Sequence, residues 1–377
     1  MHIVQVPLGQ RSYDIKIGSG LLATLAQECA RLKLERRCAI ISDTNVSSHY
    51  SVPACEALTR AGFEPIVVTV PAGETAKSLK TVHGCYDQLA AQRLERKSFI
   101  VALGGGVVGD LAGFVAATYL RGIGFIQIPT TLLAQVDSSV GGKVGVNLRA
   151  GKNLVGAFHQ PRLVLCDLET LKTLPEREFR SGLAEVIKYG IIYDEALFTE
   201  LERVMPKLLE RDTETLAKVI ARCCEIKAEV VQQDETESAL RAILNFGHTI
   251  GHALEAISHY GKYLHGEAIS IGQVAATMLS SRLTGLEAED VQRITSLFRN
   301  AGLPTTLELK GSQRAKLIAA MQHDKKVIGG EIKFVLAREI GKVEFGQAVP
   351  AELLEELLRL PTRKRRLEPV NPSNAKG

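Results

Sequence analysis

The sequence predicts an α/β protein made of a parallel-sheet domain followed by a mostly α-helical domain. In the first half, short runs rich in Val and Ile alternate with stretches of helical periodicity, and this alternation is typical of a parallel sheet with helices on both faces. After Leu174–Pro175 almost every run has the period of an amphipathic helix. We therefore expect one domain over residues 1–174, a second over 175–360, and a basic, flexible tail over 361–377.

The first half begins with two strands, 2–6 and 13–18, that we expect to pair as a hairpin. The strands that follow are almost continuously apolar, as expected where a parallel sheet is buried on both faces. In order, the predicted elements are helix 20–32, strand 38–43, helix 47–62, strand 65–70, helix 78–94, strand 98–106, helix 110–120 and strand 124–131.

The second half is predicted to be helical over 179–192, 214–235 and 237–257. A late pair of strands, 331–339 and 341–346, has the pattern of a hairpin. A sheet domain followed by a helical domain leaves a cleft between them, and such clefts are common places for small-molecule sites.

The composition is that of a soluble globular protein. Of its 377 residues 45% are hydrophobic and 23% are charged, and no apolar run reaches membrane-spanning length. A net charge of +4, 5% aromatic residues and the lack of Trp give little support for nucleic-acid binding. Seven cysteines, an odd number without a CxxC pair, predict reduced thiols. Without an apparent signal peptide, we expect a cytoplasmic protein that binds neither nucleic acid nor a membrane.

Three histidines lie close together in the segment 245–267, NFGHTIGHALEAISHYGKYLHGE. His248 and His252 are four residues apart in a helical run, so their rings share one face. A turn between antiparallel helices would bring His265 back beside His248. Two or three converging imidazoles suit Zn²⁺ or a similar metal, whereas isolated histidines are usually core or surface residues. The segment HTIGH lacks the glutamate of HExxH, which disfavours a thermolysin-type protease.

The same predicted helix carries further polar residues. Arg241, Asn245, His248 and His252 recur at intervals of three and four in an otherwise apolar run, so they would form one polar stripe. A stripe with cationic and imidazole members predicts the lining of a pocket more than a solvated face.

A glycine turn follows the predicted strand 98–106. The segment GGGVVGD, 104–110, has the pattern G-x-G-x-x-G between a strand and a helix, which is the context that dinucleotide binding requires. A plain strand–helix turn is the alternative. No acidic residue stands about twenty positions later to hold a ribose. Asp43 is the best candidate for that role, followed by Glu74 and Lys77, because these residues follow parallel strands.

Two lysines lie in a glycine-rich segment that begins near Asp137. Lys143 follows a Gly-Gly turn, and Lys152 is followed by Asn153. Glycines and lysines together suggest anion recognition, with phosphate as the best candidate. An exposed hairpin with solvated lysines is equally compatible with the local pattern.

Glu185 and Lys188 are three residues apart, on one face of an otherwise apolar helical run. A carboxylate and an ammonium on the core side of a helix need partners. A metal could take Glu185 and a bound anion could take Lys188, or the two could form a plain buried ion pair.

Together, the segments GGGVVGD, IPTTLLAQVDSSVGGKVGVN, GKNLVGAFHQP, GLAEVIKYG, NFGHTIGHALE and HGEAISIG resemble the 3-dehydroquinate synthase family. The resemblance runs in order from about Asp43 to Lys326. It implies an NAD-binding α/β domain, a helical metal-binding domain with the active site in the cleft between them, and a homodimer. It also implies NAD and Zn²⁺ (or Co²⁺) as cofactors, and the conversion of 3-deoxy-D-arabino-heptulosonate 7-phosphate to 3-dehydroquinate and phosphate in the shikimate pathway.

The resemblance also implies roles for individual residues. The metal ligands would be Glu185, His248 and His265, which leaves His252 in the pocket. Substrate-pocket residues would be Asp137, Lys143, Lys152, Asn153, Lys188, Lys227, Glu237, Arg241, Asn245 and His252, with Lys326 on the phosphate and Arg121 reaching the neighbouring subunit's phosphate site. NAD contacts would be Asp43, Asn45, Glu74, Lys77, Gly106, Val107, Val108, Gly109, Asp110, Thr130, Thr131, Lys143, Lys152, Thr170, Leu171, Lys172 and Thr173.

The reaction that the resemblance implies is a transient oxidation at C5, elimination of phosphate, re-reduction and an intramolecular aldol closure. Whether a side chain or the substrate phosphate removes the C6 proton stays open. The alternatives are a polyol dehydrogenase of the glycerol dehydrogenase type, another sugar phosphate cyclase, and an NAD-binding sensor without activity. Lys227 and Arg241 would hold a substrate carboxylate, which favours the synthase over a cyclase for a sugar phosphate that lacks a carboxylate.

Overall fold

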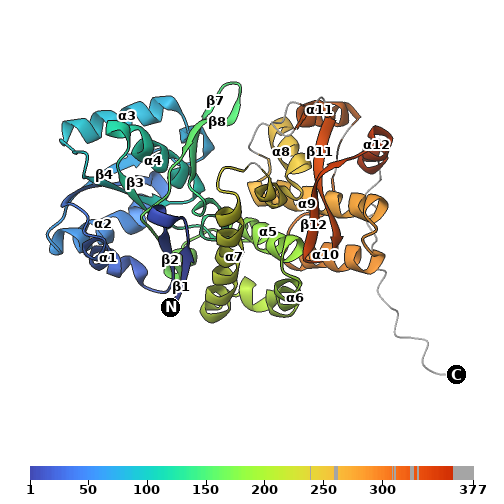
Figure 1. Ribbon diagram of the computed structural model, residues 1–377, viewed down its shortest axis with the longest axis horizontal. Coiled ribbons are helices and arrows are strands. Elements are labelled where there is room, and N and C mark those ends of the chain that lie inside the picture. Colours follow the sequence, from blue (N-terminus) through green and yellow to red (C-terminus); the bar gives the residue numbers. More distant parts are fainter. Residues whose placement is uncertain are drawn as a thin grey trace, which may run out of the picture.

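The computed structural model describes residues 1–237, 239–258, 262–307, 309, 311–322, 327–328 and 331–359. Figure 1 shows two lobes side by side, one built from the N-terminal half of the chain and one from the C-terminal half. The first lobe contains a sheet with helices on both sides, and the second is mostly helical. The predicted fold class is confirmed.

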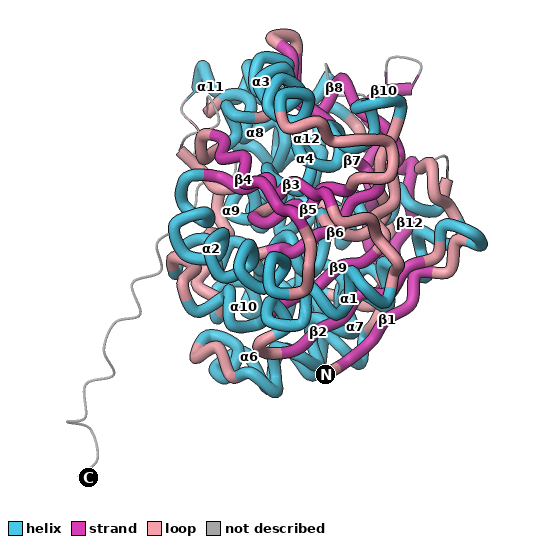
Figure 2. Tube along the Cα trace, turned by 90° about the vertical axis from the view of Figure 1, so that its left-hand side faces the viewer, coloured by secondary structure: helices cyan, strands magenta, loops and turns pink. Residues whose placement is uncertain are grey.

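The sheet of the first lobe has seven strands in the order β1-β2-β9-β6-β5-β3-β4, and Figure 2 shows them side by side. β1 pairs with β2 in the predicted antiparallel hairpin, and the other neighbours are parallel. The strands are β1 (His2–Val6), β2 (Tyr13–Gly18), β3 (Arg37–Asp43), β4 (Glu64–Val70), β5 (Phe99–Gly104), β6 (Gly124–Pro129) and β9 (Leu163–Asp167).

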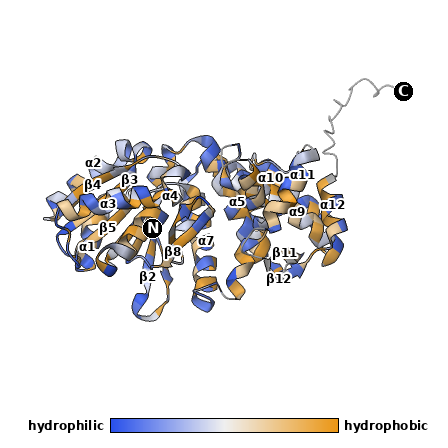
Figure 3. Ribbon diagram, turned by 90° about the horizontal axis from the view of Figure 1, so that it is seen from above, coloured by the Kyte–Doolittle hydropathy of each residue, from blue (hydrophilic) through white to orange (hydrophobic). Residues whose placement is uncertain are grey.

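Alternating side chains of each strand enter two separate cores. Ile40 packs with α1 (Leu25–Arg31) and α2 (Thr44–Arg60), whereas Ile41 packs with α3 (Leu79–Ala91) and α4 (Gly106–Thr118). Helices therefore cover both faces of the sheet, as the apolar runs predict. Figure 3 shows hydrophobic residues along the central strands and hydrophilic residues on the outer faces of the helices.

A hairpin of β7 (Lys143–Leu148) and β8 (Gly151–Phe158) projects from the first lobe. It follows η5 (Ala134–Ser138), one turn of π-helix. Short 3₁₀ turns occur at η1 (Gly9–Arg11), η2 (Leu21–Thr24), η3 (Glu74–Ala76), η4 (Tyr119–Arg121) and η6 (Leu168–Lys172).

The second lobe packs helices around a shared core that also takes in Val4, Val6, Ile15 and Ile17 of the sheet. The late strands β11 and β12 form the predicted hairpin. No described helix has the length and apolar character needed to cross a membrane. The elements are α5 (Glu176–Ile192), α6 (Glu195–Leu209), α7 (Thr213–Gln233), η7 (Leu240–Asn245), α8 (His248–Ile257), α9 (His265–Leu283), α10 (Ala288–Asn300), α11 (Gly311–Gln322), β10 (Val327–Ile328), β11 (Glu331–Glu339), β12 (Lys342–Ala348) and α12 (Ala351–Arg359).

The prediction of one continuous helix over 237–257 is wrong. The chain forms the 3₁₀ turn η7, breaks at Gly247 with φ of +78°, and begins α8 at His248. A Cβ on Gly247 would lie 2.5 Å from the backbone nitrogen of Gln273 in α9, so the break allows two backbones to approach closely. Arg241 and Asn245 therefore do not share a helical stripe with His248.

Candidate active site

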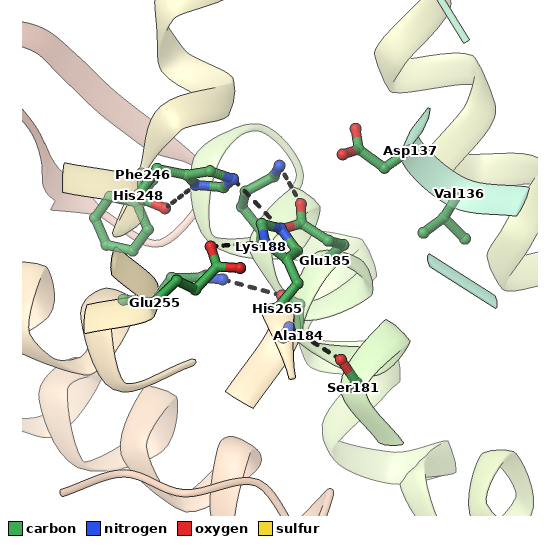
Figure 4. Close-up of polar contacts among 12 residues, drawn as sticks. Val136, Asp137, Ser181, Ala184, Glu185, Lys188, Phe246, His248, Glu255 and His265 are labelled. Carbon is green, nitrogen blue, oxygen red and sulfur yellow. Dashed lines mark hydrogen bonds and ion pairs between the residues drawn. The ribbon is translucent and has the colours of Figure 1, made fainter. Parts of the chain in front are cut away.

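Three side chains from three helices of the second lobe converge on one point (Figure 4). Glu185 comes from the middle of α5, whereas His248 and His265 are the first residues of α8 and α9. The Nε2 atoms of both histidines lie 3.6 Å from Glu185 Oε1. One donor atom from each residue lies within 4.8 Å of the other two, a spacing that one bound metal ion could bridge.

The position of His265 is fixed by the start of α9. Glu267 accepts a hydrogen bond from the backbone nitrogen of Leu264, which caps the helix. The backbone nitrogen of Gly266 donates to Ser181 Oγ on α5 at 2.9 Å. Because Ser181 lies one turn before Glu185, α9 places His265 directly beside the carboxylate.

The Glu185 carboxylate fits a metal site. It is fully buried, and among the described residues neither oxygen has a hydrogen-bond partner of good geometry. Its contacts are the two imidazoles and an ion pair with the equally buried Lys188. Burial would raise the pKa of Glu185, but the charges of Lys188 and His265 outweigh it and lower the pKa. The carboxylate is thus an ionised donor.

Both imidazoles point one nitrogen at Glu185 and anchor the other. His248 Nδ1 lies 3.1 Å from the carbonyl oxygen of Phe246, and His265 Nδ1 lies 3.3 Å from Glu255 Oε2. These acceptors favour a proton on Nδ1, which leaves Nε2 as the nitrogen that would bind a metal. Burial lowers the pKa of His265, but hydrogen bonds with Glu185 and Glu255 outweigh it and raise the pKa to about 10. Without an ion His265 therefore carries a proton on both nitrogens at neutral pH, and a metal that binds at Nε2 would displace one of them.

His252 lies next to Glu185, His248 and His265 but does not belong to this set of three donors. Its ring centroid is 5.1 Å from that of His248 and 6.0 Å from that of His265. His252, Glu255 and His265 form a second set of donor atoms within 4.8 Å of one another. The structure therefore brings all three histidines together, and His265 is common to both sets.

Buried cations lie between the metal-binding group and the sheet. Lys227 of α7 donates to the Asp137 backbone carbonyl at 2.6 Å and forms an ion pair with the Asp137 carboxylate. Burial raises the pKa of Asp137, but Lys227 and Lys188 outweigh it and hold the pKa well below its usual range. Burial lowers the pKa of Lys227. A second carboxylate, from a ligand, would find Lys188 and Lys227 already in place.

Arg241 and Lys143 lie on a neighbouring part of the same site. Arg241 is buried and donates to the carbonyl oxygens of Gly141 at 3.2 Å and Glu235 at 2.5 Å. Lys143, at the start of β7, forms an ion pair with Glu237. Asn245 donates to the same Glu237 carboxylate at 3.1 Å. The Lys143 side chain is 45% exposed and paired with a carboxylate at the same time, so it is partly solvated, as one alternative expects, and also a held cation beside the site.

The glycine turn joins a strand to a helix as predicted, but it is tighter, because the helix begins at Gly106 and not at Asp110. β5 ends at Gly104, Gly105 precedes the first residue of α4, and the first turn of α4 ends near Asp110. A Cβ on Gly106 would lie 2.9 Å from Ser138 Oγ. Free backbone nitrogens at such a helix start are suited to bind a pyrophosphate.

The other predicted nucleotide contacts surround this turn at the carboxyl end of the sheet. Asp43 caps α2 by accepting hydrogen bonds from the backbone nitrogens of Asn45 and Val46. Lys77 donates to Asp110 and to Asn153, each at 2.6 Å. Glu74 of η3 accepts a hydrogen bond from the side chain of Asn147. The remaining predicted contacts follow two other elements: Thr130 and Thr131 come after β6, and Thr170, Leu171, Lys172 and Thr173 lie in and after η6.

One predicted residue, Arg121, does not join the site within this chain, and one lies where the structure is not described. Arg121 ends η4, beyond the far end of α4, whose 13 residues span about 20 Å from the glycine turn. Lys326 lies outside the described residues.

Sequence reasoning assigned no role to Glu255 or Tyr189. Tyr189 donates to the backbone carbonyl of Val136 at 3.0 Å and to Asp137 Oδ1 at 3.2 Å, so it fixes the turn that carries Asp137. The signal for Glu255 is its spacing of seven from His248, which places both on one face of α8.

Solved structures with this fold include two synthases that hold NAD⁺ and a metal ion. A 2-epi-5-epi-valiolone synthase from Streptomyces hygroscopicus with NAD⁺ and Zn²⁺ bound is 30% identical with a TM-score of 0.84, covering 92% of this chain and 95% of that one. A 2-deoxy-scyllo-inosose synthase complexed with carbaglucose-6-phosphate, NAD⁺ and Co²⁺ is 28% identical with a TM-score of 0.84, covering 95% and 99%. An iron-containing alcohol dehydrogenase from Thermotoga maritima shares the fold with a TM-score of 0.66. It is 15% identical, and the match covers 92% of this chain and 97% of that one.

Two family models match the chain. The model for the 3-dehydroquinate synthase N-terminal domain matches residues 67–181, and that for the C-terminal domain matches residues 182–327. The 3-dehydroquinate synthase of Desulforamulus reducens is 49% identical over 358 residues, covering 95% of this chain and 99% of that relative. That of Geobacter metallireducens is 50% identical over 341 residues, covering 90% and 94%. Since both models and near full-length relatives agree, the chain belongs to the 3-dehydroquinate synthase family.

Proposed function

We propose that this protein is a 3-dehydroquinate synthase, a carbon–oxygen lyase that converts 3-deoxy-D-arabino-heptulosonate 7-phosphate to 3-dehydroquinate and phosphate. The product serves the shikimate pathway to chorismate and the aromatic amino acids. The observation that carries the proposal is the convergence of Glu185, His248 and His265 beside the buried cations Lys188 and Lys227. Relatives about half identical over nearly their whole length bear the name of this enzyme.

The cofactors of this reaction are NAD and a divalent metal, Zn²⁺ or Co²⁺. Related cyclases have been solved with NAD⁺ and Zn²⁺ or NAD⁺ and Co²⁺, and Glu185, His248 and His265 offer the carboxylate and imidazole donors that such ions prefer. Bound together, these cofactors supply a reversible hydride acceptor and a Lewis acid for a substrate hydroxyl.

The protein would hold the substrate carboxylate with buried cations. Lys227 and Arg241 lie on the sheet side of the metal ligands, and Asp137 holds Lys227 in place. Guanidinium can bind a carboxylate through two parallel hydrogen bonds. Arg241 Nε is buried without a hydrogen-bond partner among the described residues, so it can donate to a ligand.

The substrate phosphate would lie under the β7–β8 hairpin. Lys143, Lys152 and Asn153 come from this hairpin, and Asn245 and His252 come from the second lobe. Lys326 would add a further charge. Cations and amides from both lobes would orient the phosphate toward departure, and such positioning is a major part of catalysis.

The nucleotide would bind at the carboxyl end of the sheet. The backbone of Gly106, Val107, Val108 and Gly109 would face the pyrophosphate. Asp43 and Asn45 follow β3 and are placed to contact a ribose, whereas Lys77 and Asp110 already form an ion pair beside the turn. Thr130, Thr131 and the η6 segment would enclose the nucleotide from the other side.

We further infer a cytoplasmic homodimer. Arg121 and Leu120 lie on an exposed turn with positive φ at both positions, +68° and +50°. Positive φ is uncommon for residues other than glycine, and this turn has two such residues in succession. In a dimer this turn would bring Arg121 to the phosphate site of the partner subunit, where it would add a cation.

The site chemistry favours this enzyme over a polyol dehydrogenase of similar fold. Lys188 and Lys227 are paired with Glu185 and Asp137, whereas Arg241 has a buried Nε without a hydrogen-bond partner among the described residues. Three buried cations at one site suit an anionic substrate better than a neutral polyol. The carboxylate and phosphate of a heptulosonate phosphate would be matched by these cations. A cyclase for a sugar phosphate that lacks a carboxylate would leave Lys227 and Arg241 without a ligand partner.

A phosphate-release assay with the heptulosonate phosphate tests the proposal. We expect release that requires NAD⁺, shows no net accumulation of NADH, and stops when a chelator removes the metal and resumes when Zn²⁺ or Co²⁺ is restored. Net NADH production from a simple polyol, with no phosphate released from the heptulosonate phosphate, would favour the dehydrogenase instead.

A further inference from the structure

Glu255 is a buried carboxylate on the face of α8 that also carries the histidines. It lies seven residues after His248 and three after His252, so all three side chains project from one side of the helix. Only 6% of its surface is exposed. A carboxylate this buried has to have partners.

Its two oxygens have different partners from the two lobes. Oε2 lies 3.3 Å from Nδ1 of His265, the nitrogen opposite the one that faces Glu185. Oε1 accepts a hydrogen bond from Lys152 Nζ at 3.1 Å. Since Lys152 belongs to β8 of the hairpin, a single carboxylate connects a metal-facing imidazole with the element that would cover the substrate phosphate.

Each contact constrains one group. A carboxylate on Nδ1 fixes the tautomer and ring orientation of His265 and makes Nε2 a stronger donor. The same carboxylate gives the Lys152 ammonium a fixed counter-charge in a part-buried position, which holds the hairpin toward the second lobe. Neither effect requires Glu255 to touch substrate or nucleotide.

We propose that Glu255 is a positioning residue with two roles: it aims His265 at the metal and holds Lys152 over the substrate. The inference rests on the proposed function, because it takes Glu185, His248 and His265 as the metal ligands. It adds a residue that prepares the metal site and the phosphate site together.

Metal affinity and steady-state kinetics of three variants separate the two roles. In Glu255→Gln we expect affinity for Co²⁺, measured by chelator competition, to fall about 10- to 100-fold, and KM to rise even with metal saturating. In Lys152→Met we expect the KM to rise while metal affinity stays as in the wild type. Glu202→Gln, which removes a carboxylate that pairs with Arg293 on the far helices, should change neither quantity.

The Co²⁺ absorption spectrum distinguishes positioning from direct ligation. In Glu255→Gln at saturating Co²⁺ we expect a spectrum of unchanged coordination number. Wild-type Co²⁺ affinity in this variant would overturn the inference, and so would the loss of a carboxylate ligand, because Glu255 would then bind the ion directly together with His252 and His265. The metal titration needs no turnover, so it decides the role of Glu255 even if phosphate release failed.

Discussion

Replacing His265 by alanine is expected to remove the bound metal and to lower phosphate release by at least about 10³-fold, while the fold is kept. The variant loses one of three metal donors. A metal that acts as a Lewis acid stabilises the charge of the transition state by several kcal/mol, so losing the metal should lower the rate. The start of α9 survives, because Leu264 still donates to Glu267 and Gly266 still donates to Ser181. Metal analysis after dialysis, together with far-ultraviolet circular dichroism, measures both expectations.

The matched control is His83→Ala on α3. His83 is exposed and pairs only with the exposed Asp87 among the contacts described for it, so metal content and activity should equal those of the wild type. If the His265→Ala protein kept one tightly bound metal per chain, His265 would not be a ligand.

Replacing Gly266 by alanine is expected to damage the metal site from a position that offers no donor. A Cβ here would lie 2.6 Å from the carbonyl carbon of Ser181 and closer still to its oxygen. Both atoms belong to the backbone of α5, so the two helices would have to separate at the point where Glu185 and His265 meet. Overpacking of this kind costs about 1–3 kcal/mol or more. We expect lower stability toward urea without metal and weaker metal binding.

Gly84→Ala in α3 is the control for this substitution. A Cβ on Gly84 meets no atom within 4 Å, so alanine should stabilise that helix by up to about 1 kcal/mol. Equal unfolding midpoints and equal metal affinity for Gly266→Ala and the wild type would show that the contact between α5 and α9 is not as tight as described.

The sheet could be predicted from the sequence because its strands are buried on both faces. The run from Phe99 to Leu103 is apolar at every position, and each side chain enters one core or the other. The glycine turn after this strand was equally visible, since its pattern is local. The hairpins β1–β2 and β11–β12 were predicted from alternation and turn residues for the same reason.

The break before α8 could not be predicted from local periodicity. Gly247 sits in a run with a continuous helical pattern, and an isolated glycine is tolerated within a helix. What decides its conformation is the close approach of α9 at Gln273, which is a tertiary contact. The polar stripe through Arg241 was wrong because it assumed an unbroken helix.

The histidines could be recognised as a group because their spacing is local and their residue type is informative. The role of Glu255 could not be recognised from the sequence, because its partners Lys152 and His265 come from β8 and α9. Tyr189 was missed for the same reason, because its hydroxyl reaches Val136 and Asp137 across the lobe boundary. The placement of Arg121 beyond α4 shows that a residue implied by the family can lie away from the site within one chain.

The most direct measurement is a crystal structure of the protein with Co²⁺ and NAD⁺, with anomalous data collected at the cobalt edge. The account predicts one anomalous peak at about 2.0–2.2 Å from Glu185, His248 Nε2 and His265 Nε2, with the nicotinamide ring beside it and the pyrophosphate at the Gly106 turn. A peak held by His252, Glu255 and His265 without Glu185, or a nucleotide bound away from the glycine turn, would contradict it.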